Sequence, residues 1–399
     1  MFAKRTGWNW QKNELSVALE RLRSAGQAVL DLTLSNPTEC RFAQNEKAIR
    51  RALAAGEASR YHPDPRGLPA AREAVAAYYK KQHAVTVAAD DLVLTSGTSE
   101  AYSFLFRLLC NPGDQVLVPA PGYPLFDFLA DLSDVRLARF PLLYDHGWQI
   151  DLAGLAAAAS DRARALIVVH PNNPTGNYVS EEEQTKLAGF CRKRGMALVA
   201  DEVFLDFSLS GHAATSFAGS GQALTFTLSG LSKICGLPQM KLAWIVVSGP
   251  EAEKREALAR LEVIADAYLS VGTPVQLAAA EFLEMRAAWQ EQVQARIGRN
   301  LGELDRQLSQ QSGCSRLACA GGWTAVLRVP AVGSDEVLAL ELLRVRNVLV
   351  HPGHFYDFAR PGHIVVSLIV PEPEFATGIS RVLAHLNPRT GSVWPGTAN

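Results

Sequence analysis

One lysine stands in a segment whose other residues are mostly apolar or small. Residues 228–244 read LSGLSKICGLPQMKLAW, with Lys233 near the middle and Lys241 eight residues later. A lysine in such surroundings is either a surface residue on a loop or an amine whose pKa is lowered by burial, so that it acts as a nucleophile. The segment alone favours the surface interpretation. The residues that lie near Lys233 in the fold must decide between the two interpretations.

Three other segments place polar residues directly after a predicted buried strand. Residues 96–100, SGTSE, follow DLVLT and open a helix; Asn173 follows ALIVV; and Asp201 follows MALVA. Backbone N–H groups and hydroxyls at a helix start bind phosphate, although simple N-capping explains that segment about as well. Asn173 presents an amide from a double-proline turn, or only shapes the turn. A buried carboxylate such as Asp201 needs a cation nearby.

These segments lie within an alternation of predicted strands and helices that begins at about residue 91. Short apolar runs predict strands, and longer amphipathic stretches predict helices, one of which opens with Ser180 and Glu183 at the spacing of a capping box. Continuous β-branched runs are typical of strands buried on both faces of a mostly parallel sheet. In such open sheets, ligands bind where the strands end, so the four segments are expected to meet at one edge.

We therefore expect an α/β fold with two unequal domains. Residues 51–285 are predicted to form a large α/β domain with a mostly parallel central sheet flanked by helices. Residues 1–50 are predicted to supply an N-terminal arm and part of a smaller α+β domain, and residues 286–399 the rest of it. At 399 residues the chain exceeds the usual size of a single hydrophobic core.

Composition argues against several classes of function. The formal net charge is −1, so the chain lacks the basic field that nucleic acids or anionic membranes attract. No apolar run approaches the ~20 residues of a membrane helix, and no signal peptide or metal-ligand cluster is evident. The six cysteines include no CxxC pair, which favours the cytoplasm. The predicted partners are small molecules, not nucleic acid or membrane.

Taken together, a phosphate-binding segment, an amide, a carboxylate and an amine occur in an order and spacing that resemble the class I/II aminotransferases of pyridoxal 5′-phosphate (PLP) fold type I, of which aspartate aminotransferase is representative. The resemblance extends from about Leu32 to Val370 and includes NPTG at residues 173–176 and PAPGYP at residues 119–124. It implies PLP as cofactor. It also implies an aminotransferase (transaminase) that moves an amino group between an amino acid or related amine and a 2-oxo acid.

The same resemblance implies a role for each catalytic residue that matches. Lys233 would form a Schiff base with the cofactor and later shuttle a proton at the substrate carbon, while Asp201 would pair with the pyridine nitrogen. Asn173 would donate to the phenolic oxygen, and Tyr123 would stack on the ring. Tyr123 has a second interpretation as a core residue, because aromatic side chains near strand ends are often buried.

The cofactor phosphate is expected to meet small, hydroxyl-bearing and basic residues, namely Gly97, Thr98, Ser99, Ser229 and Lys241. Tyr61, in the segment YHPDPRGL, resembles a family tyrosine that reaches the phosphate of the partner subunit. This implies a homodimer with shared active sites.

Four positions depart from the family pattern. Phe204 stands where a tyrosine is common, and Gly230 stands where a phosphate-binding serine is common. Lys241 replaces an arginine, giving a point charge in place of a bidentate fork. Val365 occupies the position expected for the arginine that binds the substrate carboxylate, so that clamp is absent from its usual place.

The residue at position 365 leaves several interpretations open. A nearby cation could replace the arginine, and the candidates are His351, His354, Arg360 and His363, unless they only decorate a solvated loop. Alternatively, the substrate is not an ordinary α-amino acid, or the reaction is that of a C–S β-lyase, racemase or decarboxylase. A non-catalytic PLP-binding regulator is less favoured, because only about 30 residues precede the matched region and they contain no helix-turn-helix.

Overall fold

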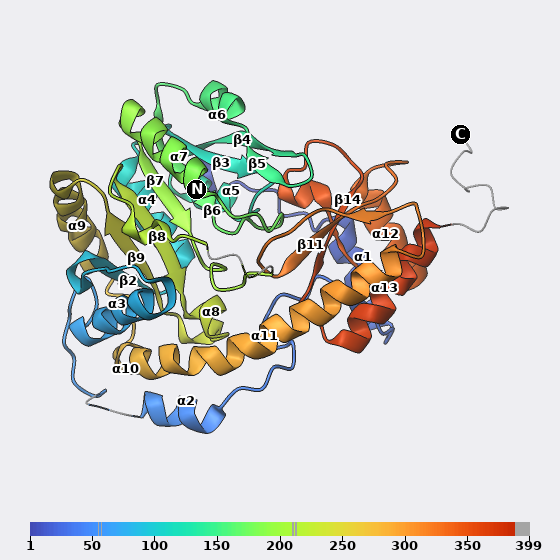
Figure 1. Ribbon diagram of the computed structural model, residues 1–399, viewed down its shortest axis with the longest axis horizontal. Helices are drawn as coiled ribbons and strands as arrows, with labels where there is room; N and C mark the ends of the chain where they lie inside the picture. The colour runs from blue at the N-terminus through green and yellow to red at the C-terminus, as the bar shows by residue number, and fades with distance from the viewer. Residues whose placement is uncertain (55, 57, 210, 212–213, 388–399) are drawn as a thin grey trace.

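The computed structural model describes residues 1–387 except residues 55, 57, 210 and 212–213. Figure 1 shows a large α/β part around a central sheet and a smaller part around β11 (Thr324–Arg328) and β14 (His363–Ser367). The long helix α11 (Ala279–Leu308) runs along both parts. We propose that the two parts are domains; the boundary expected between residues 285 and 286 lies inside α11.

Within the described residues, the central sheet has eight strands. In spatial order they are β2 (Leu92–Thr95), β9 (Ala243–Ser248), β8 (Thr225–Gly230), β7 (Ala197–Asp201), β6 (Ala163–Val169), β3 (Gln115–Ala120), β4 (Arg136–Tyr144) and β5 (Trp148–Ile150). The strands from β8 to β4 pair in parallel, whereas β9, β2 and β5 join antiparallel at the two edges. The expected mostly parallel sheet is confirmed.

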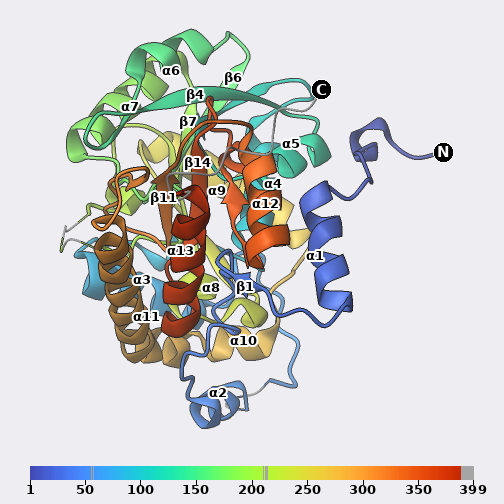
Figure 2. The same cartoon turned by 90° about the vertical axis from the view of Figure 1, so that its right-hand side faces the viewer.

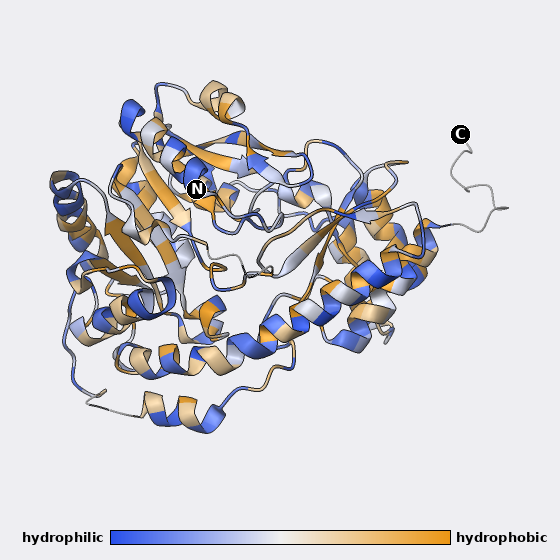
Figure 3. Ribbon diagram, in the orientation of Figure 1, coloured by the Kyte–Doolittle hydropathy of each residue, from blue (hydrophilic) through white to orange (hydrophobic). Residues whose placement is uncertain are grey.

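The strands are buried because helices cover both faces of this sheet. Every residue of β2, β7 and β8 is buried, and Figure 3 shows the apolar colouring of the sheet interior. Helices α4 (Thr98–Leu109), α5 (Phe126–Leu132) and α9 (Glu251–Asp266) pack on one face. On the other face lie α3 (Pro69–His83), α6 (Leu152–Ala158) and α7 (Glu181–Arg194).

The predicted capping box of α7 is confirmed at its first turn. The Glu183 N–H donates to Ser180 Oγ at 3.2 Å, and the Ser180 N–H donates to the Glu183 carboxylate at 2.9 Å. Two backbone donors that the helix cannot satisfy internally are thereby satisfied by side chains.

The smaller part is built from both ends of the chain. Its antiparallel sheet has the order β10 (Ser315–Arg316), β11, β14, β13 (His351–Pro352), and a separate parallel pair joins β1 (Leu30–Asp31) to β12 (Val348–Leu349). Figure 2 shows α12 (Asp335–Arg346) and α13 (Glu372–Leu386) in front of this sheet, with α1 (Glu14–Ser24) beside α12. The expected α+β arrangement is therefore present.

The remaining elements are short helices that connect or support these two parts. They are the α-helices α2 (Glu46–Leu53), α8 (Leu231–Ile234) and α10 (Thr273–Leu277), and the 3-10 helices Lys4–Thr6, Ala89–Asp91, Phe217–Gly219, Pro238–Met240 and Gly353–Tyr356. Among the described helices, none has both the length and the apolar composition needed to cross a bilayer.

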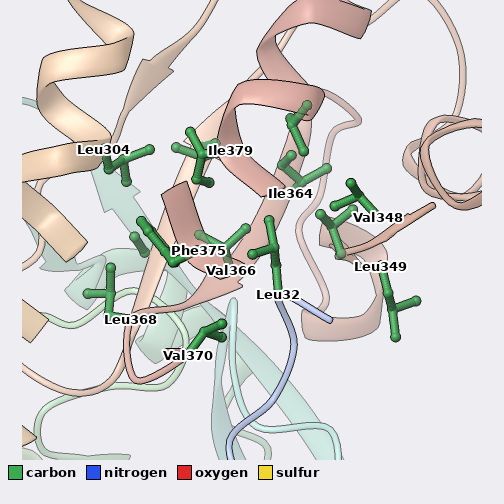
Figure 4. Close-up of a cluster of buried hydrophobic side chains, with 14 of the residues drawn as sticks. Leu32, Leu304, Val348, Leu349, Ile364, Val366, Leu368, Val370, Phe375 and Ile379 are labelled. Carbon is green, nitrogen blue, oxygen red and sulfur yellow. The ribbon is translucent and has the colours of Figure 1, made fainter. Parts of the chain in front are cut away.

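One apolar cluster joins the N-terminal segment to the C-terminal elements. Figure 4 shows Leu32 among side chains from β14, α13 and α11, including Val366, Phe375 and Leu304. Leu32, Phe375 and Leu304 have no measurable exposure to solvent. This shared core fixes the segment that follows Leu32 beside β14, which places Thr33 and Ser35 near the end of that strand.

Replacing Phe375 by alanine should destabilise the protein by about 3–5 kcal/mol, because the substitution leaves a cavity in this cluster. The matched control is Val263→Ala, on an exposed position of α9, which should change stability by no more than about 0.5 kcal/mol. Denaturant unfolding of both variants measures the difference. Equal midpoints for the two variants would contradict this assignment of the core.

Candidate active site

A cavity of about 340 Å³ lies where the two parts of the structure meet. On the large side it is bounded by the carboxyl ends of β7 and β8, and on the small side by residues of β11 and β14. Its volume is within the roughly 300–1,000 Å³ of small-molecule pockets, and its position follows the rule that open α/β sheets bind ligands at strand ends.

The cavity brings together most of the residues that the sequence indicated. Its lining includes Gly97, Thr98, Ser99, Tyr123, Asn173, Asp201, Lys233 and Lys241. Two residues lie elsewhere. Ser229 is buried behind the lining, where its hydroxyl donates to the Glu202 carbonyl at 3.3 Å. Tyr61 is 75% exposed and borders a separate hollow with His62 and Pro63.

Lys233 is carried on the one-turn helix α8 that follows β8. Leu231 and Ile234 of this helix are fully buried in the core, which turns Ser232 and Lys233 toward the cavity. The Lys233 ammonium lies 4.9 Å from the ring centroid of Trp323. Burial lowers the pKa of Lys233 to about 8, while the Asp201 carboxylate opposes that shift. The lysine is therefore a buried amine and not a surface residue.

Asp201 ends β7 and is buried beside the amine. Its Oδ2 accepts the Tyr102 hydroxyl at 2.9 Å, and its Oδ1 accepts the Val203 N–H at 3.1 Å. Burial raises the pKa of Asp201 to about 6, and these hydrogen bonds and the Lys233 charge oppose that shift. The sequence predicted a cation near this carboxylate. The charge of Lys233 acts on Asp201, and two neutral donors hold the carboxylate in place.

Tyr102 was not anticipated from the sequence, although a signal for it exists. It lies one helical turn after Thr98 on α4, and residues four apart share a face of a helix. A helix that presents Thr98 to the cavity therefore turns Tyr102 toward the sheet below it. The four-residue spacing between Thr98 and Tyr102 would therefore have indicated Tyr102 as the partner of Asp201.

The far end of the cavity has the features of an anion site. Gly97 is the N-cap of the 12-residue helix α4, so free N–H groups and the positive end of the helix dipole face this end. The Lys241 Nζ lies 3.6 Å from the point that a Cβ on Gly97 would occupy. A helix start and an ammonium thus border the same small space, which suits a phosphate.

The glycine at position 230 has a packing reason. A Cβ on Gly230 would lie 2.7 Å from the Cβ of Ala243 on the adjacent strand β9, so a serine does not fit without displacing that strand. The hydroxyl-bearing residue that lines the cavity here is Ser232, two positions later. Phe204, which also departs from the family pattern, packs edge-on against Trp323 with ring centroids 5.1 Å apart.

The residues around the cavity fit PLP. A cation and a helix start at one end match its phosphate, a buried carboxylate matches its ring nitrogen, and a buried amine matches its aldehyde. Asn173 Oδ1 and Trp323 Nε1 are buried atoms without a hydrogen-bond partner in the described part of the protein. Unpaired buried polar atoms are costly, so the lining is suited to a polar ligand.

Of the four candidate cations near position 365, one reaches the cavity. His351 on β13 pairs directly with Val365 on β14, and both line the cavity. His354 and Arg360 are exposed outside it, and His363 stacks on Phe358 at the other end of β14. Tyr356, from the same segment of the chain, also lines the cavity.

A buried polar network supports α8 from behind. Gln290 on α11 donates to the Ile234 carbonyl at 2.9 Å and to Asp206 Oδ2 at 2.6 Å. The other oxygen of Asp206 accepts the Tyr78 hydroxyl at 2.8 Å and lies 3.0 Å from His83 Nε2. The residue after Lys233 is thus tied to the long helix that connects the two parts of the structure.

Comparison with known proteins gives one consistent result. A family profile described as "Aminotransferase class I and II" matches residues 28–381. The alanine aminotransferase of Mycobacterium tuberculosis is 28% identical over 91% of this chain and 86% of its own length. The glutamate-pyruvate aminotransferase of Haemophilus influenzae is 26% identical over 92% of this chain and 93% of its own length. The solved structure of alanine aminotransferase from Pyrococcus furiosus aligns with a TM-score of 0.89 at 22% identity, covering 97% of this chain and 99% of that one.

Capture of added PLP by the cofactor-free protein should accelerate as pH rises, with a midpoint of about 8, because only the neutral amine of Lys233 attacks an aldehyde. Asp201→Asn should move the midpoint to lower pH, since the Asp201 charge raises the pKa of Lys233. Stopped-flow absorbance measures the rate. A midpoint near the ordinary lysine value of 10.5 would contradict the buried amine.

Proposed function

The chain belongs to the aminotransferase class I and II family, and on this premise we propose that Lys233 and Asp201 carry out PLP-dependent amino-group transfer between an amino compound and a 2-oxo acid. The observation that carries this proposal is the buried amine of Lys233, whose pKa is lowered to about 8 within a cavity that also holds a buried carboxylate. Titratable groups with perturbed pKa values in a cavity are characteristic of catalytic sites.

Several residues of the cavity lining would hold the cofactor. Thr98, Ser99 and the N–H groups of the first turn of α4 would bind its phosphate, and Lys241 would neutralise part of the phosphate charge. Asn173 would donate its amide to the phenolic oxygen, and Tyr123 would pack against the ring. When bound, PLP supplies an aldehyde that takes up the amino group and a ring that accepts the electron pair left on the substrate carbon.

Asp201 and Lys233 handle the protons. Asp201, with its pKa raised only to about 6, is ionised near neutral pH and holds a proton on the ring nitrogen. The Lys233 amine would hold the cofactor and would serve as the base that takes the proton from the substrate carbon that bears the amino group. A base with a pKa near the working pH is suited to this transfer, and such catalysis contributes about 10²–10⁴-fold to rate.

The aromatic side chains beside the amine keep water from it. Trp323 is 2% exposed and Phe204 is 9% exposed, and both rings lie within 6 Å of the Lys233 ammonium. A dry environment strengthens the interaction of Lys233 with Asp201 and lowers the fraction of charged amine. Phe204 therefore has an apolar role at a position where the family often has a hydroxyl.

The protein is proposed to act as a homodimer in the cytoplasm. Tyr61 is exposed and away from its own cavity, so it is free to reach the phosphate end of the partner's cavity. The six cysteines, all described, form no disulfide, which suits a reducing compartment.

Transfer of ¹⁵N from labelled amino donors to pyruvate or 2-oxoglutarate, followed by mass spectrometry, tests the function. The wild-type protein should transfer the label from at least one donor, and Lys233→Ala should reduce the rate by about 10²–10⁴-fold or more. The control is Lys193→Ala, on the exposed face of α7, which should leave the rate unchanged. Equal rates in Lys233→Ala and wild type would refute the proposal.

Sedimentation of the PLP-loaded protein should give twice the chain mass of 43.2 kDa. Tyr61→Phe should weaken PLP binding by about 10- to 150-fold without altering that mass, because one hydrogen bond to a charged phosphate is lost. Tyr268→Phe, another exposed tyrosine, serves as the control. A monomer that binds PLP as tightly as the dimer would show that Tyr61 plays no shared role.

A further inference from the structure

The turn that carries Lys233 is too short to hold itself in place. The helix α8 has four residues, and the Cys235 N–H closes its turn by donating to the Leu231 carbonyl at 3.1 Å. A single helical turn is marginal by itself, and the carbonyls at the end of a helix have no partner within that helix. The position of Lys233 therefore depends on what holds the carbonyls that follow it.

Two side-chain amides from distant segments of the chain hold these carbonyls. Gln290 on α11 donates to the Ile234 carbonyl at 2.9 Å. Gln44, which precedes α2, donates to the carbonyls of Cys235 at 3.4 Å and Gly236 at 3.3 Å. Gln290 is 7% exposed and Ile234 has no measurable exposure, so water does not reach this carbonyl if the amide is lost. The shorter and more buried hydrogen bond thus holds the residue directly after the lysine.

The amide of Gln290 has one possible orientation. A backbone carbonyl only accepts hydrogen bonds, so the NH₂ group of Gln290, and not its oxygen, must face Ile234. The same NH₂ group also donates to Asp206 Oδ2 at 2.6 Å. The Asp206 side chain is fully buried, and its Oδ1 accepts the Tyr78 hydroxyl at 2.8 Å. Asp206 therefore fixes the rotation of the amide, and Tyr78 on α3 fixes Asp206.

Packing keeps the same turn against α11. Trp289, the residue before Gln290, lies so close to Gly236 that a Cβ on Gly236 would overlap the indole ring. The φ of Gly236 is +63°, a conformation that also favours glycine. Ile234 belongs to the same buried cluster as Phe282 of α11. One helix therefore holds the turn both by close packing and by a buried hydrogen bond.

We propose that Gln290 and Gln44 are positioning residues for Lys233. Asp206 acts through Gln290, whose amide it orients. These side chains hold the backbone of the turn and not the amine itself, so they determine where the amine is presented to the cofactor aldehyde. A misplacement of about 1 Å at a reacting group can cost about 10²-fold in rate. The proposal rests on the proposed function, because it concerns the reaction of the same amine.

Capture of added PLP by the full-length cofactor-free protein tests the proposal, with Gln290→Met as the main variant. Methionine keeps the length of the side chain and removes its donors. A loosened turn admits water to the amine, so the pH midpoint of capture should rise from about 8 by about one unit. Capture at pH 7 should then slow by about tenfold, because the neutral fraction of the amine falls tenfold for each unit.

Stopped-flow absorbance measures the rate and the midpoint of each variant. A midpoint that stays at about 8 in Gln290→Met would overturn the proposal, whatever the rate, because a general loss of stability would not change the pKa of the amine. The titratable groups that act on the pKa of Lys233 are Asp201 and Cys40, and none of the variants replaces them.

The matched control is Gln294→Met. Gln294 lies one turn further along α11, and its amide donates to the backbone carbonyl of Asp206 at 3.0 Å, away from α8. This variant should keep the wild-type midpoint. The same shift in Gln294→Met as in Gln290→Met would make the effect a general property of α11 and overturn the proposal.

Three more variants test how the turn is held. Asp206→Asn retains an oxygen that accepts from Gln290 and should keep the wild-type midpoint, whereas Asp206→Ala removes it and should raise the midpoint. A wild-type midpoint in Asp206→Ala would overturn the role of Asp206. If Gln290→Met does not fold, Gln44→Met decides, because Gln44 is partly exposed and holds the same turn. Its midpoint should also rise, and a midpoint of about 8 would overturn the proposal.

Capture of PLP is measured without an amino donor, so this proposal and the proposed function fail separately. If Gln290→Met raises the midpoint and no donor transfers its amino group to an oxo acid, the proposed function fails and the positioning residues have still been identified. If a donor transfers its amino group and the midpoint does not move, the proposal about Gln290 and Gln44 fails alone.

Discussion

The structure depends on keeping one amine and one carboxylate together out of water. Lys233 and Asp201 end or follow adjacent parallel strands, and burial shifts the pKa of each toward its neutral form while the charge of the other opposes the shift. Such a pair is costly unless its remaining hydrogen bonds are satisfied. Tyr102 and the Val203 N–H satisfy Asp201, and the Trp323 ring covers the ammonium.

The fold supplies this arrangement through contacts far apart in the sequence. The parallel register of β7 and β8 fixes the two strand ends, and Gln290 ties the turn that carries Lys233 to α11. The same helix contributes Leu304 to the core of the small part, whose wall closes the cavity with Val365. The reacting groups thus lie where the two parts of the structure meet. Movement of one part against the other would change the access of a ligand to the Lys233 amine.

The sequence was most informative where chemistry follows a strand directly. Gly97, Asn173, Asp201 and Lys233 could be placed at one cavity because parallel strands end at a common edge, and the structure brings them there. The direction in which each side chain of a segment points was harder to predict from the sequence. Ser229 turns to the Glu202 carbonyl, His351 alone among four candidate cations reaches the cavity, and Gly230 reflects close contact with Ala243. Each of these depends on pairing between strands distant in the sequence, which local patterns do not specify.

The most direct test of the account is the position at which the cofactor becomes attached. The PLP-loaded protein is reduced with borohydride and digested, and the peptides are mapped by mass spectrometry. The account predicts that the added pyridoxyl mass is confined to Lys233 and disappears in Lys233→Ala. Attachment at Lys241 or at another lysine, with Lys233 unmodified, would contradict the claim that the buried amine beside Asp201 is the reacting group.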